Sequence, residues 1–233
     1  MKSQYVLPIT IVVAGALIAG AVFLAGIQKA TPGDNGKTAS VRAYTPGVDH
    51  IIGNPNAGVK IIEYMDLECP YCKTFHTTML QVMDYYGKSG KVAWVVRPFP
   101  LVSIHSKAPQ EHQAAECAAD QGGDSAYYSF IDKVFAVTPS ENNLDLKQLP
   151  IIAQGMGLNV AQFNSCLSSG KFAQRVNDSY NEAIALGVQG TPYSVLMVGT
   201  DSVELPGNQP YDSMRAAIDA VLSNTGTAST TTQ

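Results

Sequence analysis

The sequence predicts an α/β fold that is interrupted by a helical segment. Short apolar runs rich in branched residues are typical of buried strands, and apolar residues three or four positions apart are typical of helices. Strands are expected at 59–66, 91–99, 193–199 and 202–207, and helices are expected after the first strand to about residue 88, within about 101–187, and over 210–222. The order is therefore β-α-β, an all-helical insertion, and β-β-α, within one domain over residues 46–222.

The insertion is predicted from helical periodicity in three segments, 125–135, 159–167 and 171–187. In each segment apolar side chains recur on one face, and in the second segment this face includes Cys166. Gly187 is a suitable stop for the third helix.

The N-terminal residues 5–27 contain no charged side chain. As a helix this stretch would be about 34 Å long, enough for a hydrocarbon core of about 30 Å. We expect an uncleaved transmembrane signal anchor, with residues 1–4 as a cytoplasmic stub and the large domain on the extracytoplasmic side. A cleaved signal peptide is the alternative, although its apolar region is usually only about 7–15 residues. Residues 28–45 are expected to form a polar linker, and 223–233 a disordered tail.

The charge balance argues against a nucleic-acid partner. The formal net charge is -4, with 15 Lys and Arg against 19 Asp and Glu, and no basic cluster stands out. Binding to phosphates needs concentrated Lys and Arg.

Two of the four cysteines form the motif Cys69-Pro70-Tyr71-Cys72 directly after the first predicted strand. A helix N-terminus favours negative charge, so a cysteine there can have its pKa lowered from about 8.5 to roughly 3.5–7.5. Pro70 suits the first helical turn, where its missing N–H costs nothing. Cys72, one turn into the helix, would face the core and act as the resolving thiol. This spacing predicts a reactive dithiol.

Zinc binding is the main alternative for this motif. His76 follows Cys72 by four residues, so both could lie on one helix face. A structural site needs a fourth ligand, and the remaining cysteines and histidines have no zinc-ligand spacing. Haem attachment is excluded because Lys73 follows the motif where a histidine would be required. We therefore predict no metal and no cofactor.

The motif "EYMDLECPYC", a helical stretch, and then "GVQGTPYSVLMVG" resemble the DsbA-like thiol:disulfide oxidoreductases of the thioredoxin superfamily. The resemblance covers about residues 48–222. It implies a thioredoxin fold with an inserted helical domain, Cys69 as the exposed nucleophile and Cys72 as its buried partner. It also implies a cis peptide between Thr191 and Pro192 beside the cysteines, where Thr191 can pair with an extended substrate chain. We expect Pro70 and Tyr71 to contact substrate as well.

Three acids precede the nucleophile. The resemblance places Glu63 as a buried acid beneath the site, which could accept the proton of Cys72. Asp66 and Glu68 are expected to face solvent. Glu68 replaces an apolar residue, and its charge is expected to moderate the oxidising power of the site, so that Glu68→Gln would lower the pKa of Cys69.

Cys117 and Cys166 both lie within the predicted helical insertion. They could be buried, reduced and hydrophobic. An exported domain and an even cysteine count favour a bridge, and some DsbA-like relatives carry a second disulfide here. We expect a structural disulfide.

The sequence therefore predicts a membrane-anchored protein-disulfide oxidoreductase in the periplasm or at the cell exterior. It would exchange disulfides with protein thiols, most simply as an oxidant that a membrane redox partner recycles. The motif does not decide direction, so a reductase or isomerase on the same fold is the nearest alternative. A non-catalytic metal-binding or chaperone module is the alternative from another class.

Overall fold

A computed structural model describes residues 40–228 of the protein, with the side chains of 224–228 left out. These residues form a five-stranded sheet in the order β1-β3-β2-β4-β5. The strands are β1 (His50–Gly53), β2 (Val59–Met65), β3 (Val92–Pro98), β4 (Tyr193–Val198) and β5 (Asp201–Pro206). β2 and β3 are parallel, and the other neighbouring pairs are antiparallel. The four predicted strands are confirmed; β1, too short for a periodic signal, was not predicted.

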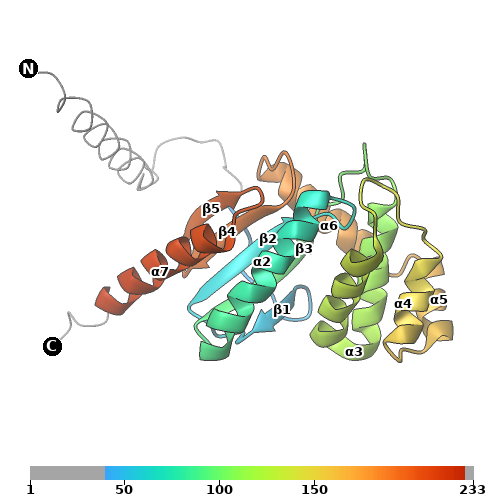
Figure 1. The fold of residues 1–233 in the computed structure, drawn as a ribbon, viewed down its shortest axis with the longest axis horizontal. Coiled ribbons are helices and arrows are strands. Elements are labelled where there is room, and N and C mark those ends of the chain that lie inside the picture. The colour runs from blue at the N-terminus through green and yellow to red at the C-terminus, as the bar shows by residue number, and fades with distance from the viewer. Residues whose placement is uncertain (1–39, 229–233) are drawn as a thin grey trace, which may run out of the picture. The chain divides into compact units, whose positions relative to one another are not determined.

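The sheet has helices on both faces (Figure 1). Because side chains alternate along β2, Ile61 joins one apolar core and Ile62 the other. α2 (Pro70–Tyr86) and α7 (Tyr211–Ala228) supply the first core, and α6 (Ala173–Ala185) supplies the second. The parallel pair requires a crossover, which α2 and the short 3-10 helix η1 (Gly87–Ser89) provide.

The helical insertion lies between β3 and β4 and consists of α3 (Ala108–Val137), α4 (Gln148–Gly155), α5 (Val160–Ser168) and α6. α3 contains a break at Gly123, whose φ of 64° is costly for residues with a side chain. α3 thus begins well before the predicted helix at 125–135, and α4 was not predicted. The α/β fold with a helical insertion is confirmed.

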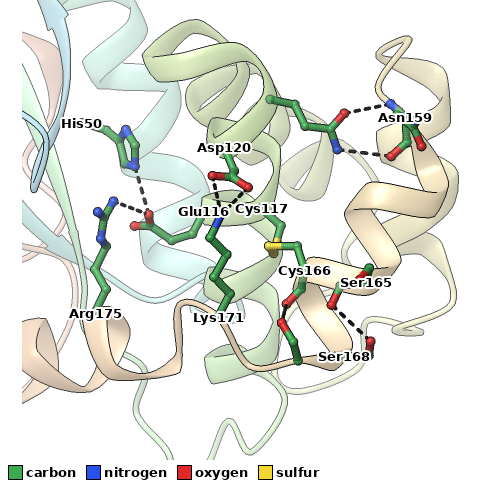
Figure 2. The surroundings of a disulfide bond; sticks show 12 residues. His50, Glu116, Cys117, Asp120, Asn159, Ser165, Cys166, Ser168, Lys171 and Arg175 are labelled. Carbon is green, nitrogen blue, oxygen red and sulfur yellow. Dashed lines mark hydrogen bonds and ion pairs between the residues drawn. A yellow bond between two sulfur atoms is a disulfide. The ribbon is translucent and has the colours of Figure 1, made fainter.

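A disulfide joins Cys117 of α3 to Cys166 of α5 (Figure 2). The Cα atoms are 5.9 Å apart and the residues are separated by 49 positions in sequence. Next to it, the ammonium of Lys171 lies 2.6 Å from the carboxylate of Asp120. The disulfide and this ion pair both tie the later helices of the insertion to α3.

The ends of the chain differ in part from expectation. The predicted transmembrane segment and residues 28–39 of the predicted linker lie outside the described residues, and within 40–228 we find no helix of the length and apolarity that a bilayer requires. Arg42, in the predicted linker, pairs with Asp49 at 2.8 Å, and the buried Arg97 donates to the main chain of Arg42. α7 continues past its predicted end at Leu222 to Ala228, so the expected tail is helical over 223–228.

Candidate active site

The cysteine motif lies where β2 leads into α2. Cys69 is the N-cap of α2, and Pro70 occupies the first turn, as predicted. No side chain caps this helix end, so its main-chain N–H groups remain available to the Cys69 sulfur. Both cysteines are free thiols. Tyr71 is exposed beside them and Cys72 is fully buried.

Cys69 is less exposed than the resemblance implied, with only 4% of its surface accessible. The loop before β4 accounts for this, because the Cys69 sulfur lies 3.4 Å from the main-chain oxygen of Thr191, to which it donates only when it is protonated. The following peptide, Thr191–Pro192, is cis, as predicted. Pro192 is buried, and its own carbonyl accepts a hydrogen bond from Gly207. A substrate chain would therefore meet the sulfur across the edge of this loop.

The two thiols have opposite acid strengths. The hydrogen bond with the Cys72 thiol lowers the pKa of Cys69 to about 6 against the opposing effect of burial. The side chain of Thr191 lowers it next, and main-chain hydrogen bonds of Cys72 and Tyr71 add smaller contributions. Complete burial raises the pKa of Cys72 well above its usual value, and the negative charge of Cys69 raises it further. At neutral pH, Cys69 is therefore largely a thiolate while Cys72 keeps its proton.

Glu63 lies in β2 with no exposed surface, so its predicted burial is confirmed. Trp94 Nε1 donates to one carboxyl oxygen at 2.9 Å, while the other has no hydrogen-bond partner among the described residues. Burial raises the pKa of Glu63 to about 8, so the group can hold or release a proton near neutral pH. The charge of Glu63 also contributes to the raised pKa of Cys72.

The prediction that Asp66 and Glu68 face solvent is wrong. Both are fully buried, because loops of the helical insertion cover the turn that carries them. Asp66 Oδ2 accepts hydrogen bonds from Leu101 N at 2.6 Å and from the ring of His105 at 2.9 Å. Glu68 Oε1 accepts from Leu144 N at 2.9 Å.

Glu111 of α3 was not identified from the sequence. It is fully buried near Glu68, and burial, followed by the adjacent Glu68 carboxyl group, raises the pKa of Glu111 to about 9. The sequence around Glu111 does not indicate that this residue lies beside Glu68, because the two residues are far apart in the chain.

The zinc alternative finds no geometric support in the described part of the chain. His76 Nε2 contacts Asp132, and its ring lies between Trp94 and Phe135. Across residues 40–228, no three His, Cys, Asp or Glu side chains are placed to share one metal ion.

The site combines a thiolate, a buried thiol and a cis proline, and the comparisons with known proteins agree with this arrangement. The model of the family described as Thioredoxin matches residues 45–220. The chain belongs to this family. DsbA2 from Pseudomonas aeruginosa is similar in structure, with 27% identity, a TM-score of 0.63, and coverage of 74% of this chain and 94% of that chain. At 24% identity, alpha-DsbA1 from Wolbachia pipientis shares the fold, with a TM-score of 0.67 and coverage of 78% and 94%.

The predicted resemblance to DsbA-like thiol:disulfide oxidoreductases is thereby confirmed, and these neighbours support an enzyme of that class. Among curated proteins, a Na(+)/H(+) antiporter NhaA 1 from Mycolicibacterium gilvum is 29% identical over 154 residues. The match covers 65% of this chain but 24% of the antiporter, so the chain spans about a quarter of the curated relatives it matches.

Proposed function

We propose that the protein is a thiol:disulfide oxidoreductase that exchanges disulfides with protein substrates and acts in the oxidising direction. The observation that carries this proposal is the pairing of a lowered pKa at Cys69 with a fully buried, protonated Cys72 behind it. Such an asymmetric pair can form and resolve a mixed disulfide.

The oxidising cycle starts from a disulfide between Cys69 and Cys72. A substrate thiolate attacks the Cys69 sulfur, the Cys69–Cys72 bond breaks, and Cys72 leaves and takes up a proton. We assign the delivery of this proton to Glu63, whose pKa of about 8 suits the transfer. A second thiolate of the same substrate then attacks the substrate sulfur of the mixed disulfide. This closes the substrate disulfide and releases Cys69 as a thiolate. The substrate loses two electrons and gains a disulfide, and the enzyme holds the dithiol.

The lowered pKa of Cys69 supports the oxidising direction. Stabilising the Cys69 thiolate stabilises the reduced enzyme, and this makes the disulfide form more oxidising. Lowering the Cys69 pKa from 9.0 to about 6 contributes about 1.4 kcal/mol at pH 7, or about 30 mV for two electrons. This contribution vanishes as the pH falls through about 6 and grows as the pH rises toward 9. It favours oxidation but is modest by itself.

We also propose that residues 5–27 anchor the protein, with the catalytic domain in the periplasm or at the cell exterior. The uncharged length of this segment supports anchoring. The disulfide between Cys117 and Cys166 supports an oxidising compartment. A membrane protein that carries a disulfide would reoxidise the dithiol by accepting its two electrons. In cell fractionation, the full chain should stay with membranes after an alkaline wash, and its release would contradict the anchor.

The equilibrium of the Cys69/Cys72 couple with glutathione tests the proposed direction. We expect a reduction potential of about −200 mV or above, whereas a more negative value would indicate a reductase. Incubation with a protein that contains a disulfide tests the chemistry itself, because the Cys69 thiolate attacks that disulfide, releases one substrate thiol and stays bonded to the other sulfur until Cys72 resolves the adduct. The Cys72→Ser variant should accumulate a mixed disulfide through Cys69, and the matched Cys69→Ser variant should not. Absence of the adduct in both would overturn the proposed function.

A further inference from the structure

Glu68, the residue before the nucleophile, holds a loop of the helical insertion with both its side chain and its main chain. We refer to residues 138–144 as the 138–144 loop. Glu68 Oε1 accepts from Leu144 N at 2.9 Å, and Oε2 accepts from Asn143 N at 3.3 Å and from Thr138 Oγ1 at 3.4 Å. The Glu68 carbonyl accepts from Glu141 N at 2.8 Å. One residue thus satisfies three main-chain donors of the loop.

The 138–144 loop has an unusual backbone where it meets Glu68. Ser140, Glu141 and Asn142 have φ values of 67°, 56° and 65°. Residues other than glycine rarely adopt this left-handed region, and consecutive ones persist only where surrounding contacts hold them. The left-handed run turns the following N–H groups toward Glu68, which holds the loop together with Lys73 and Lys107.

The turn that carries Glu68 is connected in the same way to the nucleophile. Glu68 N donates to Asp66 Oδ1 at 2.7 Å, and Cys69 N donates to the Asp66 carbonyl at 3.2 Å. Asp66 Oδ2 is itself bound to Leu101 N and His105. The turn from Asp66 to Cys69 is therefore held on both sides by segments of the insertion, and a shift of Glu68 would move Cys69 directly.

We propose that Glu68 is a positioning residue for the nucleophile. By anchoring the 138–144 loop, it keeps Cys69 at the N-terminus of α2, where main-chain N–H groups stabilise the thiolate. This inference rests on the proposed thiol–disulfide exchange, and it adds a role for the helical insertion in setting the reactivity of Cys69.

Anchoring and charge repulsion predict opposite effects of removing Glu68. Repulsion alone, as expected from the sequence, would make loss of the carboxylate lower the pKa of Cys69. The carboxylate is, however, surrounded by the donors of Thr138, Asn143 and Leu144. Loss of the anchor would free the turn and weaken the contacts that stabilise the thiolate. We therefore expect the pKa of Cys69 to rise.

The charged and titratable groups around Glu68 leave this expectation unchanged. Glu111 of α3 faces it with a pKa raised by burial, so this neighbour is protonated at neutral pH. Asp66 lies in the same turn, and Lys107 binds the Leu144 carbonyl of the loop through its ammonium. Lys73 of α2 binds the Thr138 carbonyl. None of these groups is altered in the variants below.

The experiment measures alkylation of Cys69 by iodoacetamide as a function of pH in the reduced full-length protein, with the adduct quantified by peptide mass. We expect Glu68→Ala to raise the apparent pKa, and a rise of about one unit would slow alkylation at pH 6 about fivefold. Thr138→Val removes a donor from the loop side and keeps the Glu68 charge. It should shift the pKa in the same direction by less. Glu68→Gln, which keeps one acceptor, should also shift it less than Glu68→Ala.

Glu141→Gln is the matched control, because it removes an exposed charge from the same loop and keeps the main-chain N–H that binds Glu68. It should leave the pKa of Cys69 unchanged. A lower pKa in Glu68→Ala would overturn the proposal in favour of repulsion. If Glu68→Ala does not fold, an unchanged pKa in Thr138→Val would overturn it. Because alkylation needs no protein substrate, failure of the proposed exchange activity would be seen separately.

Discussion

The two cysteine pairs show how position in the fold decides what a thiol does. Cys69 caps the start of α2, whereas Cys166 lies in the last turn of α5. A helix N-terminus stabilises a thiolate and a helix C-terminus disfavours one. The first pair is free and differs in acid strength between its members, and the second is closed as a disulfide.

The groups that surround the two cysteine pairs also differ. Cys69 and Cys72 share their site with the ionisable Glu63 and with a main-chain acceptor, Thr191 O. Cys117 is buried among apolar residues of α3. The first pair therefore has a buried acid with a raised pKa beside it, whereas the second pair connects α3 and α5.

Removing the second disulfide should give the largest change in stability. For the double variant Cys117→Ser/Cys166→Ser we expect a free energy of unfolding lower by about 4 kcal/mol, since the bridge closes a loop of 49 positions. Urea unfolding measures this loss. The reduction potential of Cys69/Cys72 should stay the same, and a clear shift in it would contradict a purely structural role for the second pair.

Replacing Glu63 should change how stability depends on pH. The folded-state pKa of about 8 exceeds the unfolded value of about 4.5, so burial of Glu63 costs little at low pH and increasingly more as the pH rises toward 8. Between pH 5 and pH 8 the unfolding free energy of the native protein should fall by about 3 kcal/mol relative to Glu63→Gln. Urea unfolding of the oxidised forms measures this difference without contributions from the active-site thiols. Equal slopes in the two proteins would refute the raised pKa.

The smallest effect is expected at the ion pair beside the second disulfide. Lys171 and Asp120 have side chains that are 49% and 39% exposed, so solvent screens their attraction. Lys171→Ala should lower the free energy of unfolding by less than about 0.5 kcal/mol, and high salt should remove the difference. Thermal unfolding with and without added salt tests this. A loss as large as that of the disulfide variant would contradict the weak, screened character expected of this ion pair.

Much of the fold follows from local pattern. β2 and β3 carry mainly apolar residues on both faces, and the helices at 159–167 and 171–187 repeat their apolar residues at helical spacing. β1 and α4 are too short to show a period, and α3 contains alanines and two adjacent glycines that weaken its signal. Such elements form because the rest of the domain packs against them.

The candidate site was likewise predicted from the sequence only in part. The spacing of Cys69 and Cys72, Pro70 at the helix start, and the Thr191-Pro192 loop were all expected from the sequence. The burial of Asp66 and Glu68 was missed because their covering loops come from the insertion, about 35 and 75 residues later in the chain.

The sequence by itself determined the order of elements, the reactive motif and its family resemblance, because these depend on residues close together in the chain. Only the tertiary structure decided that Glu68 is buried and holds the 138–144 loop, and that Glu111 lies beside it. Contacts between distant segments exclude water from these carboxyl groups, and no local pattern encodes that exclusion.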